Sequence, residues 1–199
     1  MSLGTTVGHL LLLSTCLLYV LPLRRLSPLP QGVAVAVCAG IGLVKVGDLR
    51  LIGYPAGVLG DLSVTTQILL AGLLVKRLAG IDALPLHDRK FLLAAAAAAG
   101  FLLYILSSGL TALDLYSLGF GSGALLTVLA LATIVCWRYQ PGAAVVILLG
   151  VLAFELSLLP SANLWDYLLD PALVLFAWGW ALTIALRRLR SPQRNPGPA

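Results

Sequence analysis

Charged side chains are scarce in this chain of 199 residues. Asp, Glu, Lys and Arg together make up 11% of it, whereas hydrophobic residues make up 60%. A soluble domain carries roughly 25% charged residues, and the mean hydropathy of +1.00 indicates a chain whose main solvent is lipid. The scarcity of charge therefore excludes an ordinary soluble domain and makes the lipid bilayer the first expected partner.

The formal net charge is +5, which by itself would be compatible with nucleic-acid binding. A nucleic-acid surface needs Lys and Arg gathered on one solvated face, interleaved with polar or aromatic contacts. Here the basic residues separate apolar runs instead. We therefore expect no nucleic-acid partner and assign the basic residues to membrane orientation.

Residues that hold metals or build catalytic sites are also few. The chain has three cysteines, Cys16, Cys38 and Cys136, without a C-x-x-C spacing, and it has no H-E-x-x-H motif or Walker loop. Each cysteine lies within an apolar run, so we interpret all three as small buried hydrophobes. His87-Asp88 reads as a solvated loop whose Asp caps the next helix. These patterns predict no cofactor and do not indicate an enzyme.

What the sequence does contain is long apolar runs. Lipid offers no water to backbone polar groups, so spanning segments must be helices or a closed barrel, and continuous apolar runs favour helices. We predict an all-α integral membrane protein, a bundle of about seven transmembrane helices forming one domain over residues 1–186. A basic tail, residues 187–199, is expected to be disordered in the cytoplasm. The predicted spans are Gly4–Leu23, Gln31–Val46, Gly57–Val75, Phe91–Leu110, Gly123–Trp137, Ala143–Leu159 and Pro171–Leu186.

The distribution of basic residues predicts the orientation of these helices. Lys76, Arg77, Arg89 and Lys90 flank one loop close to the ends of two apolar runs, where positive charge most strongly resists translocation. Placing this loop in the cytoplasm and alternating sides puts eleven of the thirteen basic residues inside. The prediction is an N-terminus outside and a C-terminus inside. Short loops, and outer segments without a glycosylation sequon, favour a bacterial cytoplasmic (inner) membrane.

Acidic residues gather on the predicted outer side. Asp61 and Glu155 lie a few residues inside their spans, where a charge is costly unless it faces the bundle interior, a cavity or a basic partner. Two interpretations stay open: a site for a cation, a proton or a cationic headgroup, or ion pairs that pin helix ends together. The candidate carboxylates are Asp48, Asp61, Asp114, Glu155, Asp166 and Asp170, with Lys45 and Arg50 as basic partners.

Three outer segments, residues 48–57, 114–123 and 163–171, combine acids with aromatics, and we expect them to lie in the membrane interface with their carboxylates toward water. The first two share an Asp-Leu start and a G-x-x-x-G spacing, Gly53/Gly57 and Gly119/Gly123. We expect these glycines to allow close helix packing, with Gly57 and Gly123 more critical than Gly150. The third predicted span is the most polar, with Ser63, Thr65, Thr66 and Gln67.

Three hypotheses about function follow. The first is a non-catalytic partner or scaffold subunit of an envelope complex, associating with another membrane protein or with a second copy, because the short loops leave little room for a soluble domain. The second is a small ion-coupled transporter that uses the outer carboxylates. The third is an enzyme acting on lipid headgroups at the outer interface. A cavity beside Asp61 and Glu155 would favour transport.

The predicted topology is tested by neutralising the loop that carries most of the orienting charge. Replacing Lys76, Arg77, Arg89 and Lys90 together with Gln should give a mixed orientation, because the difference in basic residues across the membrane is then much smaller. Reporters fused to the C-terminus, one active only in the cytoplasm and one only outside it, measure the outcome. A wild-type fusion active only outside the cytoplasm contradicts the assignment.

Overall fold

The computed structural model describes residues 2–20, 27–109, 114–121 and 123–190. Within them the chain is almost entirely helical, with one short hairpin. Proline opens α2, α7 and α9, where its missing N–H costs no hydrogen bond. The elements in chain order are α1 (Leu3–Val20), α2 (Pro28–Leu43), β1 (Lys45–Val46), β2 (Leu49–Arg50), α3 (Gly53–Leu59), α4 (Val64–Ala79), α5 (Leu86–Leu106), η2 (Tyr116–Gly119), α6 (Gly123–Tyr139), α7 (Pro141–Glu155), α8 (Trp165–Leu168) and α9 (Pro171–Arg190).

Six of the predicted apolar segments each overlap one helix, although the second runs on into β1 and the sixth runs past the end of α7, and the third is divided. Its first residues belong to α3, which ends at Gly60, where φ is +72°. The chain then turns, and α4 begins at Val64, with Ser63 as N-cap accepting a hydrogen bond from the Thr66 N–H. The predicted boundary was wrong because Gly60 and Ser63 are stop and start signals inside an apolar run.

Lengths and surfaces of the helices are those of a membrane-integrated protein. The helices α1, α5 and α9 have 18, 21 and 20 residues and are apolar enough to cross a membrane, while α2, α6 and α7 are apolar but shorter. Large hydrophobic side chains cover the outward faces, and on α6 they include Val128, Leu131, Ile134 and Val135. So much exposed apolar surface is unusual for a protein in water. The basic end of α9 extends to Arg190, and the rest of the predicted tail lies outside the described residues.

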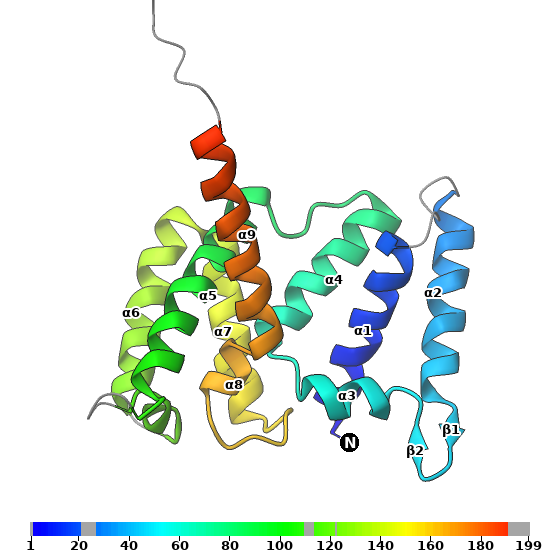
Figure 1. The fold of residues 1–199 in the computed structure, drawn as a ribbon, viewed down its shortest axis with the longest axis horizontal. Helices are drawn as coiled ribbons and strands as arrows, with labels where there is room; N and C mark the ends of the chain where they lie inside the picture. The colour runs from blue at the N-terminus through cyan, green and yellow to red at the C-terminus, as the bar shows by residue number, and fades with distance from the viewer. Residues whose placement is uncertain (1, 21–26, 110–113, 122, 191–199) are drawn as a thin grey trace, which may run out of the picture.

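The connections gather at two opposite ends of the bundle (Figure 1). The β1–β2 hairpin, α3, η2, α8 and the start of α1 lie at one end, which we call the α3–α8 end. The α4–α5 connection and the last turn of α9 lie at the other, which we call the basic end. The segments predicted for the outer interface thus share one end, and the orienting basic loop lies at the other.

The inward faces of the helices differ in chemistry on the two sides of the bundle. Around α5, α7, α8 and α9 the core is apolar and includes Ala96, Leu103 and Val174. In α1 the buried side chains are largely polar, namely Thr5, His9, Ser14 and Thr15. Polar groups inside and apolar groups outside are expected when lipid is the solvent, since lipid cannot satisfy polar side chains.

Close helix packing occurs at Gly100 and Gly150, and not at Gly57 and Gly123. A Cβ added at Gly57 or Gly123 would meet nothing within 4 Å, so the expectation that these two are critical was wrong. A Cβ at Gly100 of α5 would lie 2.5 and 2.6 Å from the two Cγ atoms of Val174 in α9, and one at Gly150 would lie 2.7 Å from Leu168. The G-x-x-x-G pattern did not discriminate, because a spacing does not say which face meets a neighbour.

The cysteines also depart in part from the expectation. Cys136 is buried, but Cys38 is half-buried and Cys16 is exposed. Cys16 and Cys38 therefore lie partly or wholly on outward surfaces of α1 and α2. Their burial was wrongly predicted because an apolar run in a membrane protein has a lipid-facing side as well as a core-facing one.

The contact between α5 and α9 gives a stability prediction. Gly100→Ala should lower the free energy of unfolding by about 1–3 kcal/mol, because the new methyl group overlaps the β-branched Val174. Gly179→Ala in α9 is the matched control, since a Cβ there meets nothing within 4 Å, and it should be neutral or stabilising by up to about 1 kcal/mol. Denaturant unfolding in mixed micelles measures both variants. Equal effects would contradict the assigned α5–α9 contact.

Candidate functional site

The six candidate carboxylates lie at or near the α3–α8 end in three kinds of environment. Asp48, Asp114 and Glu155 are exposed, whereas Asp61 and Asp166 are partly buried. Asp170 is buried, with 3% of its surface exposed. The expectation that all carboxylates of the interfacial segments point to water is therefore wrong for Asp170, whose side chain turns inward.

Asp170 joins the N-terminal ends of two helices. Its Oδ1 accepts a hydrogen bond from the Leu173 N–H at 2.8 Å, which caps α9. Its Oδ2 accepts hydrogen bonds from the Ser63 N–H at 2.9 Å, from the Ser63 hydroxyl at 2.7 Å and from the Thr66 hydroxyl. The negative charge thus sits at the positive ends of both α4 and α9, and its buried oxygens are satisfied by four protein donors.

Asp166 holds together the segments before α6 and after α7. It accepts hydrogen bonds from the Tyr116 hydroxyl, at 3.0 and 3.1 Å to its two oxygens, and from the Ser161 hydroxyl. Burial, followed by this hydrogen bond and the nearby carboxylate charge, raises the pKa of Tyr116 to about 12. The phenol therefore stays protonated and donates to Asp166 throughout the physiological pH range.

Asn163 is a residue of this network that the sequence analysis missed. Its Nδ2 donates to the Tyr116 carbonyl and its Oδ1 accepts from the Trp165 N–H, both at 2.9 Å. The side chain lies against Gly119, where any Cβ would collide with it. Trp165 Nε1 donates to the Leu115 carbonyl at 2.8 Å. The Gly119 position is thus needed for the contact between two loops, whereas the G-x-x-x-G spacing that marks it in the sequence predicted a contact between helices.

Asp61 connects the segment before α4 to α1. Its Oδ1 accepts a hydrogen bond from the Thr5 hydroxyl. One turn further along α1, His9 is fully buried, with Nδ1 2.9 Å from the Thr5 carbonyl, so Nδ1 carries the proton in this contact. Burial together with the charges of Asp166 and Asp61 raises the pKa of Tyr167, despite the lowering effect of its hydrogen bond to Leu159. The four-residue spacing of Thr5 and His9 would have indicated their shared face.

The remaining acids have local surroundings. Asp114 Oδ1 accepts hydrogen bonds from the Tyr116 and Ser117 N–H groups and so starts η2. Asp48 lies in the turn of the hairpin, after Gly47 with φ +65°. Glu155 is the last residue of α7. Its side chain is exposed.

The predicted basic partners do not pair with these acids. Lys45 and Arg50 face each other across the hairpin as an antiparallel strand pair, and both are exposed. Among the described residues, ion pairs join Asp82 to Lys76 and Arg89, and Asp88 to His87. The proposed seam of ion pairs at the α3–α8 end is therefore wrong, because hydroxyl and backbone donors take the place of cations.

At the basic end, Asp88 differs from its expected role. It is 1% exposed, Pro85 rather than Asp88 is the N-cap of α5, and its Oδ2 is 3.4 Å from His87 Nε2. A Cβ at Gly142 would lie 2.7 Å from Oδ2, so the carboxylate rests at the start of α7. The spacing Asp88, Leu92, Ala96, Gly100 could have revealed this burial, since all four share one helix face. Asp82 nearby is solvated, and its hydrogen bond to Lys76 lowers its pKa.

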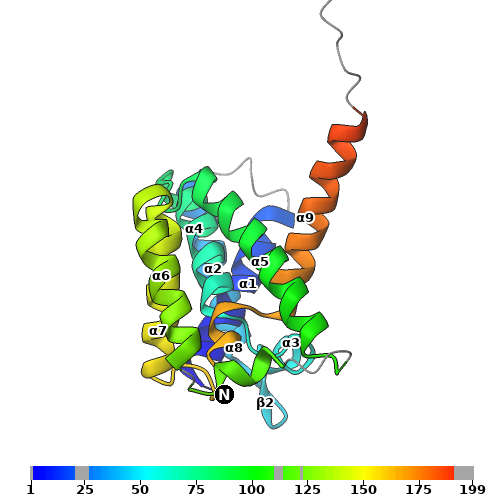
Figure 2. The same cartoon turned by 90° about the vertical axis from the view of Figure 1, so that its left-hand side faces the viewer.

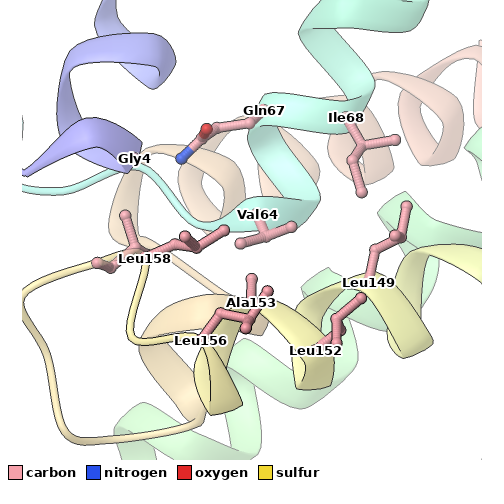
Figure 3. A pocket seen from close by; sticks show the side chains of 10 residues that line it. Gly4, Val64, Gln67, Ile68, Leu149, Leu152, Ala153, Leu156 and Leu158 are labelled. Carbon is pink, nitrogen blue, oxygen red and sulfur yellow. The ribbon is translucent and has the colours of Figure 1, made fainter.

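A groove opens between the α1 start, α4 and α7 (Figure 3). Its volume is about 210 Å³. Gln67 contributes the polar side chain, and its Nε2 donates to the Leu62 carbonyl at 2.9 Å. We call it the α1–α4–α7 groove, and its lining residues are Gly4, Val64, Gln67, Ile68, Leu149, Leu152, Ala153, Leu156, Leu158 and Leu159.

Within the described segments, no group of three His, Cys, Asp or Glu side chains is placed to hold a metal.

The cap formed by Asp170 gives a second stability prediction. Asp170→Asn should lower the free energy of unfolding by about 2–4 kcal/mol, because an amide donor replaces an acceptor facing buried N–H and hydroxyl groups. Asp48→Asn, at an exposed carboxylate of the same end, should change it by less than about 0.5 kcal/mol. Denaturant unfolding in mixed micelles compares the two variants. If both behave alike, Asp170 does not fasten α4 to α9.

Comparison with known proteins gives no family for this chain. Neither protein-family models, nor curated protein sequences, nor solved structures show a significant match to it. The roles assigned above therefore rest on hydrogen bonds, burial and packing within the chain itself.

Proposed function

We propose that this chain is a non-catalytic, multispanning membrane protein that serves as a partner or scaffold subunit of an envelope complex in a bacterial inner membrane. The outer face of α2 is the association surface in this proposal. The observation that carries it is a row of small residues, Gly32, Ala36 and Gly40, that the bundle itself does not use.

The row lies on one side of α2 because residues four apart share a helix face. A Cβ added at Gly32 or Gly40 would meet nothing within 4 Å, and Ala36 and Gly40 are exposed. The opposite side of α2 packs on the bundle, since Gly42 faces Leu10 and Leu13 of α1. Helix α2 stands at the edge of the assembly beside α1 (Figure 1). Its small-residue row is therefore accessible from the membrane.

A ridge of branched side chains runs beside this row. Val33, Val37 and Ile41 are 55–56% exposed and repeat at the same four-residue interval. A shallow row of small residues next to such a ridge lets a second helix approach closely and interlock, which is how helices associate in lipid. Valine and isoleucine also lose little rotamer freedom on contact, since a helix already restricts them.

The carboxylates support a structural role over transport. Asp170 and Asp166 accept hydrogen bonds from protein donors, and Asp61 accepts one from Thr5. An ion-coupled transporter would need a polar route beside Asp61 and Glu155. The α1–α4–α7 groove lies in this region, but apart from Gln67 its lining is apolar. This chemistry favours the partner proposal and weighs against an ion carrier.

The proposal is tested by filling the α2 row. The double variant Gly32→Leu/Gly40→Leu should weaken a complex purified in mild detergent by about tenfold, roughly 1.4 kcal/mol, because the bulky side chains prevent close helix approach. Its own thermal unfolding should change little, since both positions are open. Gly179→Leu, at an open glycine of α9, is the matched control.

Size-exclusion chromatography with multi-angle light scattering identifies the complex as a stoichiometric heteromer or as a second copy of the chain. An unchanged complex in the double variant, or a wild-type protein that is monomeric in membranes by cross-linking, contradicts the proposal.

A further inference from the structure

The α1–α4–α7 groove has the dimensions and direction of a hydrocarbon chain. From Leu149 to Leu156 it follows α7 for seven residues, roughly 10 Å at the helical rise. Leu156, Leu158 and Gly4 line it near the α3–α8 end, while Ile68 and Leu149 line it farther along α4 and α7 (Figure 3). Its course along the helices is also the course of a lipid tail in one leaflet.

The chemistry of the walls suits an acyl chain. Leucine, isoleucine, valine, alanine and glycine form the lining, and Gln67 is the one polar side chain among them. A site for an ion or for water needs several polar partners, which this lining lacks. Gln67 extends toward Gly4, close to the end of the groove at the α3–α8 end (Figure 3).

Two carboxylates are close in the sequence to residues that line the groove. Glu155 belongs to the same turn of α7 as Leu152 and Leu156, and it is exposed. Asp61 precedes Val64 by three residues and is partly exposed. Of its two carboxylate oxygens, Oδ1 accepts the described hydrogen bond, from the Thr5 hydroxyl. No ion pair neutralises either acid within the described part of the chain. Two acids without a described cationic partner thus adjoin this end of the groove, Glu155 next to Leu156 in the chain and Asp61 through its contact with Thr5, the neighbour of Gly4.

We propose that the groove binds one acyl chain of a membrane lipid with a primary amine headgroup, whose ammonium group lies beside Asp61 and Glu155. The apolar walls select hydrocarbon, and the two carboxylates select a cationic headgroup over an anionic one. This lipid site is independent of the α2 face, because it uses α1, α4 and α7 instead.

The test compares retention of phosphatidylethanolamine and phosphatidylglycerol with identical acyl chains. Purified full-length protein is equilibrated with equal amounts of both lipids in detergent, and bound lipid is counted by native mass spectrometry. Wild type should retain the amine lipid about threefold to fivefold more, the effect of one or two exposed charge pairs. Glu155→Gln should reduce the ratio toward one, whereas Asp48→Asn, at an exposed acid of the hairpin, should leave it unchanged.

Two neighbouring substitutions test the groove itself. Leu149→Trp places bulk in the groove, whereas Leu148→Trp adds the same bulk outside it, and both leucines are well exposed, at 40% and 49%. Only Leu149→Trp should lower the amount of amine lipid bound, by about threefold or more, because the indole ring takes the space of the acyl chain. Equal retention of the two lipids by wild type, or equal retention by the two Trp variants, overturns the proposal.

Discussion

The carboxylate of Asp170 is the constraint on which the arrangement of the α3–α8 end depends. It lies where α4 and α9 begin, and it accepts hydrogen bonds from Ser63, Thr66 and Leu173. Helix N-termini present unpaired N–H groups that are costly to bury without an acceptor. One buried anion supplies that acceptor to two helices from opposite halves of the sequence. It therefore fixes the α1–α4 side of the bundle against the α5–α9 side.

A second layer of polar contacts surrounds this anchor. Tyr116, Asn163 and Asp166 tie the loop before α6 to the loop after α7. Thr5 and Asp61 tie the first helix to the start of α4. Each contact matches a neutral donor with a carboxylate or carbonyl acceptor, and the described cations at this end, Lys45 and Arg50, stay on the exposed hairpin. Short helices in lipid have little hydrophobic force to hold them together, so hydrogen bonds and close packing at Gly100 carry that task.

The same hydrogen-bond network distinguishes acids that the sequence does not. Asp170 and Asp166 are occupied by protein donors, whereas Glu155 is exposed at the end of α7 and Asp61 keeps part of its surface exposed. Leu156 and Gly4, which line the apolar groove, are chain neighbours of Glu155 and of Thr5, the donor to Asp61. The inference of a lipid site follows from this division, since only a carboxylate left accessible beside hydrocarbon walls is available to an ammonium headgroup.

Composition and hydrophobic pattern alone indicated a helical, membrane-integrated chain, and they located six of its helices and most of α4, because spanning segments need long apolar runs wherever they sit in the bundle. The gathering of the acidic segments at one end also followed from alternation along the chain. Only the tertiary structure decided that Gly60 and Ser63 split a predicted span, that Gly100 rather than Gly123 meets a neighbour, and that Asp170 is buried while Glu155 is not. These features depend on which face of each helix meets another, and lipid-facing and core-facing positions in an apolar run use the same residue types.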